Sequence, residues 1–308
     1  MMGPMERLPE DVLAICEQVL AELEGDSSPD GRVRYANALM AKAITLAGMG
    51  RHAEEVAAYD QIITRYRNDL EPGVREFVAR AMLNKGAEIK APLQSLELFS
   101  ELIARYAQDP TPLVAECVAR AFLNSGIVLR DLDRHYDSIA YFDQTITYAR
   151  EDPDPDVREC VAQAFVAKLT ALERTGRPAE ALFVCNRVLT EYSVDPDPKM
   201  VRQMLRAARA KLGILARLGR SEAEQILARQ QLIALDDNDP DPAVREDMVL
   251  TMTYQIIVLC ELERYDEARA VFARVIDRYG DEVTEAPAVQ DGVRAARKFI
   301  RPALEIGD

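Results

Sequence analysis

Apolar residues along the chain recur at helical spacing, in pairs of segments separated by a short polar turn. From Val157 onward, a first segment carries apolar residues three or four positions apart, and a second segment does the same after the turn at 174–177. This period of about 3.6 residues predicts two amphipathic helices and not strands. The apolar positions are Val161, Ala164, Phe165, Leu169 and Leu172 in the first segment, and Ala181, Leu182, Cys185, Val188, Leu189 and Tyr192 in the second.

The two-helix unit returns along the chain behind an acidic, proline-rich seam. The seam "DPDPDVRE" at 152–159 has close counterparts at 69–76, 109–116, 195–202 and 239–246. Aligned on their last proline, from Pro29 to Pro287, the seams follow one another at intervals of 43, 40, 43, 43, 44 and 45 residues. A period this regular is typical of a solenoid, in which each unit packs on its neighbours. The seam is therefore predicted to lie inside one array, although 308 residues alone would favour two domains.

Each seam carries signals that end one helix and begin the next. In Asp154-Pro155, Asp197-Pro198 and Asp241-Pro242, the Asp is placed to accept an unpaired backbone N–H. Proline suits the first helical position because no N–H is needed there. An arginine recurs in the first turn, and we expect it to pair with seam carboxylates of its own or a neighbouring repeat. These arginines are Arg34, Arg75, Arg158, Arg202 and Arg245.

The units resemble tetratricopeptide repeats (TPR). Repeat three, "AFLNSGIVLRDLDRHYDSIAYFDQTI" at 121–146, has the small residue Gly126, then Ser138 twelve positions later, then Phe142. The family has a small residue, an Ala and an aromatic residue at these spacings. The resemblance implies an all-α fold: a right-handed superhelix, or solenoid, of antiparallel helix pairs. In that fold the first helix of each pair lines a concave groove.

Two departures from the family pattern stand out. The period of about 43 residues exceeds the usual 34, and Glu55 and Glu224 occupy the position of the Ala. We predict a single TPR-like solenoid over 1–308. It comprises a lone helix at 10–23, six helix-turn-helix repeats over 30–282 and a C-terminal capping helix at 286–301, which makes fourteen helices.

Composition narrows the classes of partner. The formal charge of −14 disfavours direct binding of nucleic acid, which needs clustered Lys and Arg. No apolar run approaches the roughly 18 residues that span a membrane, and the start lacks the pattern of a secretory signal. The five cysteines form no CxxC pair, which fits a reducing compartment and buried, hydrophobic roles. We therefore expect a cytoplasmic protein without a membrane partner.

The chain offers little catalytic chemistry. It has no glycine-rich phosphate loop, no HExxH and no GxSxG motif. The two histidines, His52 and His135, follow an Arg in equivalent turns, and we expect them at the solvent-facing edge and not as metal ligands. No catalytic residue, cofactor or metal is predicted, and an enzyme is the least favoured class.

One segment contrasts with the acidic background. Residues 199–220 hold seven Lys and Arg and no acid, and Arg202, Arg206 and Arg209 recur at i, i+4 and i+7 on one helix face. The resemblance places Arg206 and Arg209 at groove-facing positions. The matching positions of repeats two and three hold Arg80, Asn84, Arg120 and Asn124.

Arginine with asparagine can hold a carboxylate through charge-assisted hydrogen bonds. The family's clamp for C-terminal carboxylates also needs a Lys and a second Asn, where this chain has Met40 and Ile44, so it cannot be transferred whole. The alternative is a structural one, in which these arginines form an ion-pair lattice between repeats.

The sequence thus favours a non-enzymatic scaffold that binds a peptide or a partner protein in the concave groove of the solenoid. A stacked helical array presents the extended surface that this role needs. The alternative is a peptide-sensing regulatory or accessory subunit of a larger complex. The sequence does not identify the partner.

Overall fold

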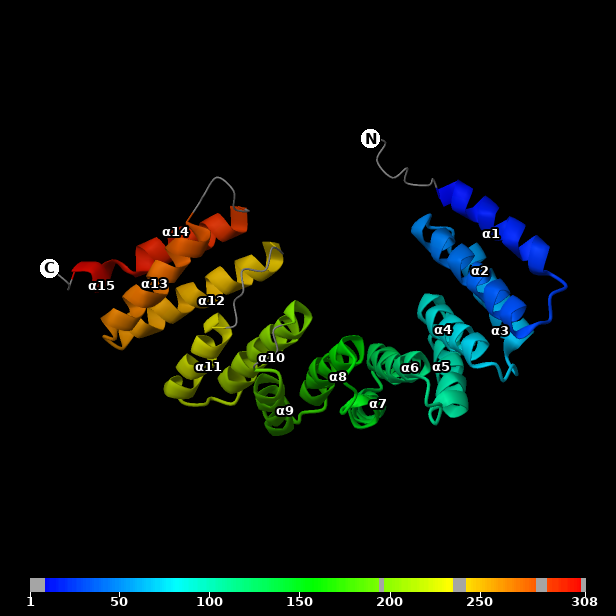
Figure 1. Ribbon diagram of the computed structural model, residues 1–308. Helices are drawn as coiled ribbons and strands as arrows, with labels where there is room; N and C mark the ends of the chain where they lie inside the picture. Colours follow the sequence, from blue (N-terminus) through cyan, green and yellow to red (C-terminus); the bar gives the residue numbers. More distant parts are fainter. Residues whose placement is uncertain (1–8, 194–196, 235–241, 281–286, 306–308) are drawn as a thin grey trace, which may run out of the picture. The chain divides into compact units, whose positions relative to one another are not determined.

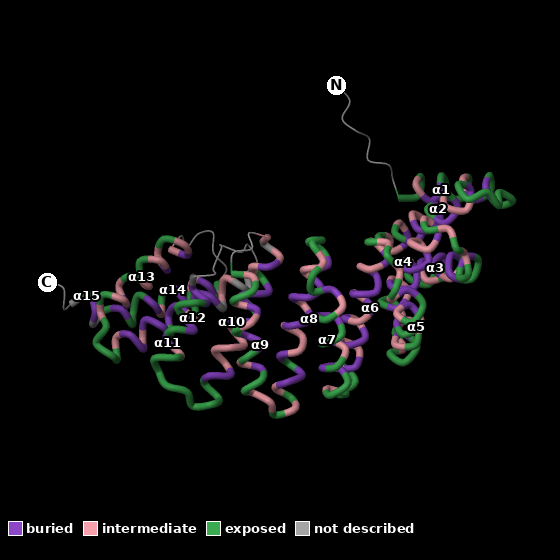
Figure 2. Tube along the Cα trace, turned by 60° about the horizontal axis from the view of Figure 1, so that its bottom comes forward, coloured by how far each residue is buried: buried purple, intermediate pink, exposed green. Residues whose placement is uncertain are grey.

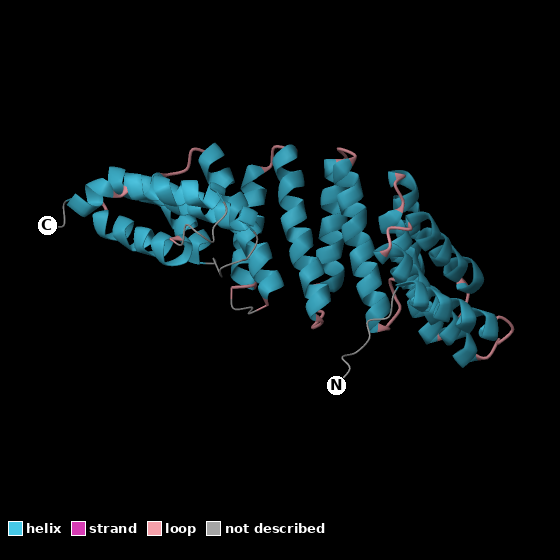
Figure 3. Ribbon diagram, turned by 90° about the horizontal axis from the view of Figure 1, so that it is seen from above, coloured by secondary structure: helices cyan, strands magenta, loops and turns pink. Residues whose placement is uncertain are grey.

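The computed structural model describes residues 9–193, 197–234, 242–280 and 287–305, and every regular element within these ranges is an α-helix (Figures 1 and 3). The prediction of an all-α solenoid of helix pairs is confirmed. The first eight helices are α1 (Pro9–Leu23), α2 (Pro29–Gly48), α3 (His52–Tyr66), α4 (Pro72–Glu88), α5 (Pro92–Tyr106), α6 (Pro112–Asp131), α7 (His135–Ala149) and α8 (Pro155–Arg174). The others are α9 (Pro178–Glu191), α10 (Pro198–Arg217), α11 (Glu222–Ala234), α12 (Pro242–Glu261), α13 (Tyr265–Tyr279), α14 (Pro287–Phe299) and α15 (Arg301–Glu305).

The helices form two compact units, Met1–Thr175 and Gly176–Asp308. The first unit contains α1 to α8 and the second contains α9 to α15. The division lies in the turn between the two helices of the predicted fourth repeat. One array over 1–308 therefore stays a prediction. The short helix α15 was not expected, because residues 301–305 lack the apolar periodicity of the earlier helices.

The seam residues begin the helices as their chemistry requires. The Asp154 carboxylate accepts the backbone N–H groups of Asp156 and Val157 at the start of α8, and Asp197 accepts that of Lys199 at the start of α10. A proline follows each aspartate as the first helical residue. These two predicted caps are confirmed, and Asp241 lies outside the described residues.

A glycine of the first helix packs directly against an aromatic ring of the second. A methyl carbon placed on Gly126 would lie 2.5 Å from Cε1 of Phe142, and one on Gly86 would lie 2.4 Å from Cε1 of Phe99. Both rings are buried, and buried positions form stripes along the helices (Figure 2). The small residue and the aromatic residue of the sequence pattern therefore contact each other, and this contact allows the two helices of a pair to approach closely.

Periodic ion pairs tie neighbouring repeats of the first unit together. Arg75 Nη1 lies 3.1 Å from Asp109 Oδ2, which confirms the expected pairing of a first-turn arginine with the next seam. In the preceding repeat, Arg32 and not the expected Arg34 forms this contact, 2.8 Å from Asp69. Lysines add bridges to residues 25 positions earlier: Lys42 to Glu17, Lys85 to Asp60 and Lys168 to Asp143.

The first helices of the first unit lie on its inner side. Helices α2, α4, α6 and α8 contact one another in succession, in addition to the second helices beside them. A stack whose first helices also touch one another curves toward that side. The residues Arg80 and Asn84 of α4, and Arg120 and Asn124 of α6, belong to these inner helices.

Helix α6 is both long and apolar. By length and composition alone, Pro112–Asp131 could cross a membrane. Half of its apolar window is buried, and it packs against α4, α5, α7 and α8. The core helix of a soluble protein passes the same test, so its apolar character is accounted for by these neighbours.

Substitution of Gly126 by alanine should destabilise the protein relative to the same change at Gly213. Alanine gains about 1 kcal/mol of helix propensity at either site. At Gly126 the methyl group also displaces the Phe142 ring, which costs about 1–3 kcal/mol, whereas at Gly213 it meets only Arg217 Nη1, at 3.8 Å. Urea unfolding of both variants measures the difference, and equal stabilisation by both would contradict the contact.

Cys117 and Cys160 should resist alkylation in the folded protein. Burial raises the pKa of each thiol to about 12, so at pH 8 roughly one molecule in ten thousand carries the reactive thiolate. Iodoacetamide labelling followed by peptide mapping should modify the partly exposed Cys260 first. It should reach Cys117 and Cys160 only after denaturation, and fast labelling of either in the native protein would contradict their burial.

Candidate functional site

The asparagines predicted to face the groove lie in two different settings. Asn84 Nδ2 donates a hydrogen bond to the Tyr59 hydroxyl at 3.3 Å, so this amide is engaged within the helix stack. Asn124 lines an open pocket of about 290 Å³ among α4, α5 and α6. That pocket has apolar walls, including Phe99 and Val128, and Asp131 contributes a carboxylate.

Arg80 and Arg120 flank the same buried thiol on the inner helices. Both guanidinium charges act to lower the pKa of Cys117, against the larger effect of burial. Arg120 Nε donates to Glu116 Oε1 of its own helix at 2.7 Å. Arg80 forms no ion pair with any residue that the structure describes.

The arginines of α10 divide between the surface and a pocket. Arg202 and Arg206 are exposed and have no ion pair among the described residues, although Arg206 Nη1 donates to Gln203 Oε1 at 3.4 Å. The ion pairs between repeats use other residues, such as Arg75 and Lys85. The choice between a groove and the lattice alternative stays a prediction for Arg202 and Arg206, because residues 235–241, which include the start of the next seam, lie outside the described residues.

Arg209 lines an open pocket of about 460 Å³ in the second unit, formed by α10, α11 and α12. We call it the Arg229 pocket, after the buried arginine among its lining residues. Leu250 and Tyr254 are exposed on one wall, so the pocket presents apolar surface beside its cations. Its lining residues are Arg209, Leu212, Ala216, Gln225, Arg229, Leu250, Thr251 and Tyr254.

Arg229 is 5% exposed, an unusual state for a guanidinium. Its Nη2 donates to Gln225 Oε1 at 3.4 Å, and its guanidinium carbon lies 4.5 Å from the centre of the Tyr254 ring. Among the residues described, Nε and Nη1 have no hydrogen-bond acceptor. Burial lowers the pKa of Arg229, and the nearby Tyr254 and Glu222 only partly oppose this.

A buried cation with unused donors is costly, because its lost hydration is not replaced. An anionic group entering the pocket would supply the missing acceptors through charge-assisted hydrogen bonds. Sequence reasoning selected Arg209 but missed Arg229. A signal was present, since Arg229 stands between Ile226 and Ile233 on the apolar face of α11, three and four positions away.

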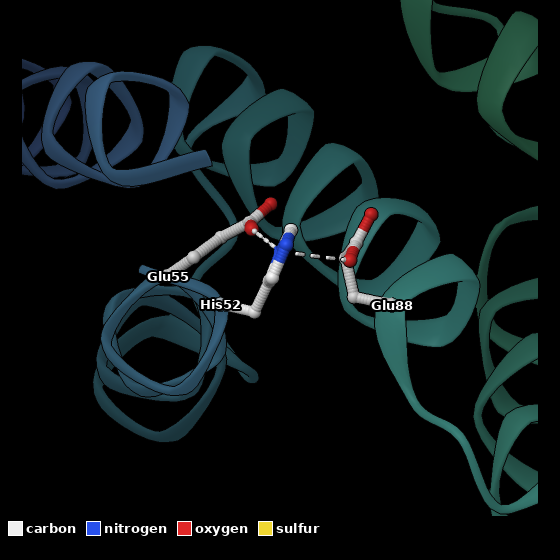
Figure 4. Close-up of side chains that lie close together, drawn as sticks. All are labelled: His52, Glu55 and Glu88. Atoms are coloured by element: carbon white, nitrogen blue, oxygen red, sulfur yellow. Dashed lines mark hydrogen bonds and ion pairs between the residues drawn. The ribbon is translucent and has the colours of Figure 1, made fainter. Parts of the chain in front are cut away.

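The two histidines differ from each other. His52 is exposed, as expected, but its Nδ1 lies near carboxylates of Glu55 and Glu88 (Figure 4). These three residues form a group that could hold a metal ion. His135 is only partly exposed, and its Nε2 lies 3.5 Å from Asp133 Oδ1.

Comparisons with known proteins give similarity in fold alone. No protein-family model matches this chain, and no curated protein matches it in sequence. The solved structure of BtubC (BKLC) from P. vanneervenii is similar with a TM-score of 0.54 and 13% identity, over 77% of this chain and 95% of that one. Two further solved structures are less similar. An engineered protein has a TM-score of 0.37 and 14% identity, over 95% of this chain and 97% of that one. The TPR2AB domain of yeast Sti1 in its pHSP90 complex has a TM-score of 0.32 and 14% identity, over 87% of this chain and 98% of that one. The similarity to BtubC is one of fold, in an all-α chain of packed helix pairs.

Proposed function

We propose that this protein is a non-enzymatic scaffold of the TPR type. In this proposal the Arg229 pocket binds an acidic segment of a partner polypeptide. The observation that carries it is the buried guanidinium of Arg229, whose Nε and Nη1 have no acceptor among the described residues. A carboxylate matches a planar guanidinium in charge and in hydrogen-bond geometry, and it is the anionic group of an unmodified polypeptide.

The walls of the pocket specify what flanks the carboxylate. Leu212, Leu250 and Tyr254 supply apolar surface, which favours a bulky apolar residue next to the acid. A volume of about 460 Å³ falls within the range of ligand sites and admits one or two side chains. Because the whole chain carries a charge of −14, an acidic partner is attracted only where cations gather.

The same lining supports binding of an anion. Its polar groups are two arginines, a glutamine, a threonine and a tyrosine. All of these can donate hydrogen bonds to a carboxylate. A peptide-sensing accessory subunit would bind an acidic segment in this pocket in the same way. The two alternatives therefore differ in which partner is bound and not in how the pocket binds it.

Replacement of Arg229 by glutamine should weaken binding of acidic peptides about tenfold or more. The loss follows from removing a charge-assisted pair, whose energy is about twice that of a neutral hydrogen bond. A random 12-residue peptide library selected on the intact protein should enrich Asp or Glu beside a bulky apolar residue. Fluorescence anisotropy with the selected peptides then measures the affinity of each variant.

Arg220→Gln is the matched control, because it also removes one arginine charge, but at an exposed residue outside the pocket lining. It should change the affinity less than about twofold, as screened surface charges do. Equal losses in both variants would show a nonspecific effect of charge. Enriched peptides without an acid, bound equally well by the Arg229 variant, would refute the proposal.

A further inference from the structure

Glu55 is a buried carboxylate at a position that small residues hold in other repeats. It is 3% exposed and lies in the first turn of α3. The same position after the turn is occupied by Ser138 in α7, Ala181 in α9 and Ala268 in α13, all fully buried. Burying a charged carboxylate is costly without a compensating cation, so its place in this helix needs an explanation.

The other acidic departure from the family pattern, Glu224, has a local role that Glu55 lacks. The Ser221 N–H donates to Glu224 Oε2 at 3.2 Å, and the Glu224 N–H donates to Ser221 Oγ at 3.4 Å. This reciprocal pair is a capping box. In α3 the turn arginine, Arg51, pairs instead with Glu54, at 2.7 Å, which leaves Glu55 to another partner.

That partner is a group of metal-ligating atoms. His52 Nδ1 lies 3.3 Å from Glu55 Oε2 and 3.5 Å from Glu88 Oε2, and the three ligand atoms all lie within 4.8 Å of one another (Figure 4). In a tetrahedral zinc site, N and O ligands about 2.0–2.1 Å from the ion are about 3.4 Å from each other. The two distances from the imidazole therefore match edges of such a site.

The carboxylate of Glu55 is held in place by residues behind it. Tyr59 Oη donates to Glu55 Oε1 at 3.4 Å, and Asn84 Nδ2 donates to Tyr59 Oη at 3.3 Å. Ligating carboxylates are oriented by hydrogen bonds of this kind, and Oε2 is left to face His52 and Glu88.

We propose that His52 Nδ1, Glu55 Oε2 and Glu88 Oε2 form a binding site for a divalent transition metal of the Zn²⁺ type. Imidazole combined with carboxylate favours zinc over magnesium or calcium, which prefer oxygen ligands alone. The side chains of His52 and Glu88 are 65% and 39% exposed, so an ion can enter and keep water as its fourth ligand. A bound ion would link the first turn of α3 to the end of α4. The site lies in the first unit and does not depend on the proposed peptide pocket.

The test is a titration of the metal-free full-length protein with ZnCl₂ and CoCl₂. Zn²⁺ should raise the melting temperature with saturation at one equivalent, whereas MgCl₂ at the same concentration should not. Co²⁺ should give the visible absorption of a four-coordinate site. In His52→Ala and Glu88→Gln, Zn²⁺ affinity measured by calorimetry should fall about tenfold or more.

His135→Ala is the matched control, because its repeat has Ser138 in place of the buried glutamate, and its Zn²⁺ affinity should equal that of the wild type. Glu55→Gln should also lose the site. Circular dichroism shows whether each variant is folded. If Glu55→Gln does not fold, the variants of the two exposed ligands, His52→Ala and Glu88→Gln, test the proposal. Wild-type binding no tighter than that of His52→Ala would overturn the proposal and leave a His52 ion pair with the two carboxylates as the role of the group.

Discussion

A pair of helices of 15 to 20 residues cannot bury its apolar faces alone, so each hairpin depends on close contact within the pair and with its neighbours. The contact of Gly126 with the Phe142 ring is the clearest case, since not even a methyl group fits between them. The pocket that Asn124 lines is built around the equivalent contact of the preceding repeat, since Gly86 and Phe99 are among its lining residues.

Much of the fold was predictable because its signals are local. Seam residues such as Asp154 and Pro155 act within one turn of chain, and they mark where α8 begins. The glycine–aromatic contact was visible as a spacing, because helical geometry converts sequence separation into a shared face. The division between α8 and α9 has no such signal, since the repeating pattern continues through it. The arginine that pairs with the next seam lies three residues after the aligned proline. This position holds Arg75 after Pro72 and Arg32, not Arg34, after Pro29.

The candidate sites were less predictable because they are made by contacts between helices. The pattern of α11 places Arg229 on the apolar face of the helix, but its contact with the Tyr254 ring depends on the packing of α12 and is not specified by that pattern. Asn84 was expected to face a ligand, but its amide bonds to Tyr59 of the preceding repeat. Glu55 was noticed only as a misfit, and its proximity to Glu88 requires α3 and α4 to be packed together. The positions of charged residues were therefore predictable, whereas their partners were not.

The proposed function depends on the Arg229 guanidinium receiving an acidic group from a partner. Nuclear magnetic resonance of the arginine Nε–H groups observes this interaction directly, during titration with a selected acidic peptide. The Nε–H signal of Arg229 should shift with the bound fraction of peptide, while that of Arg220 stays fixed. A peptide that binds without moving the Arg229 signal would show that the guanidinium does not receive the acidic group.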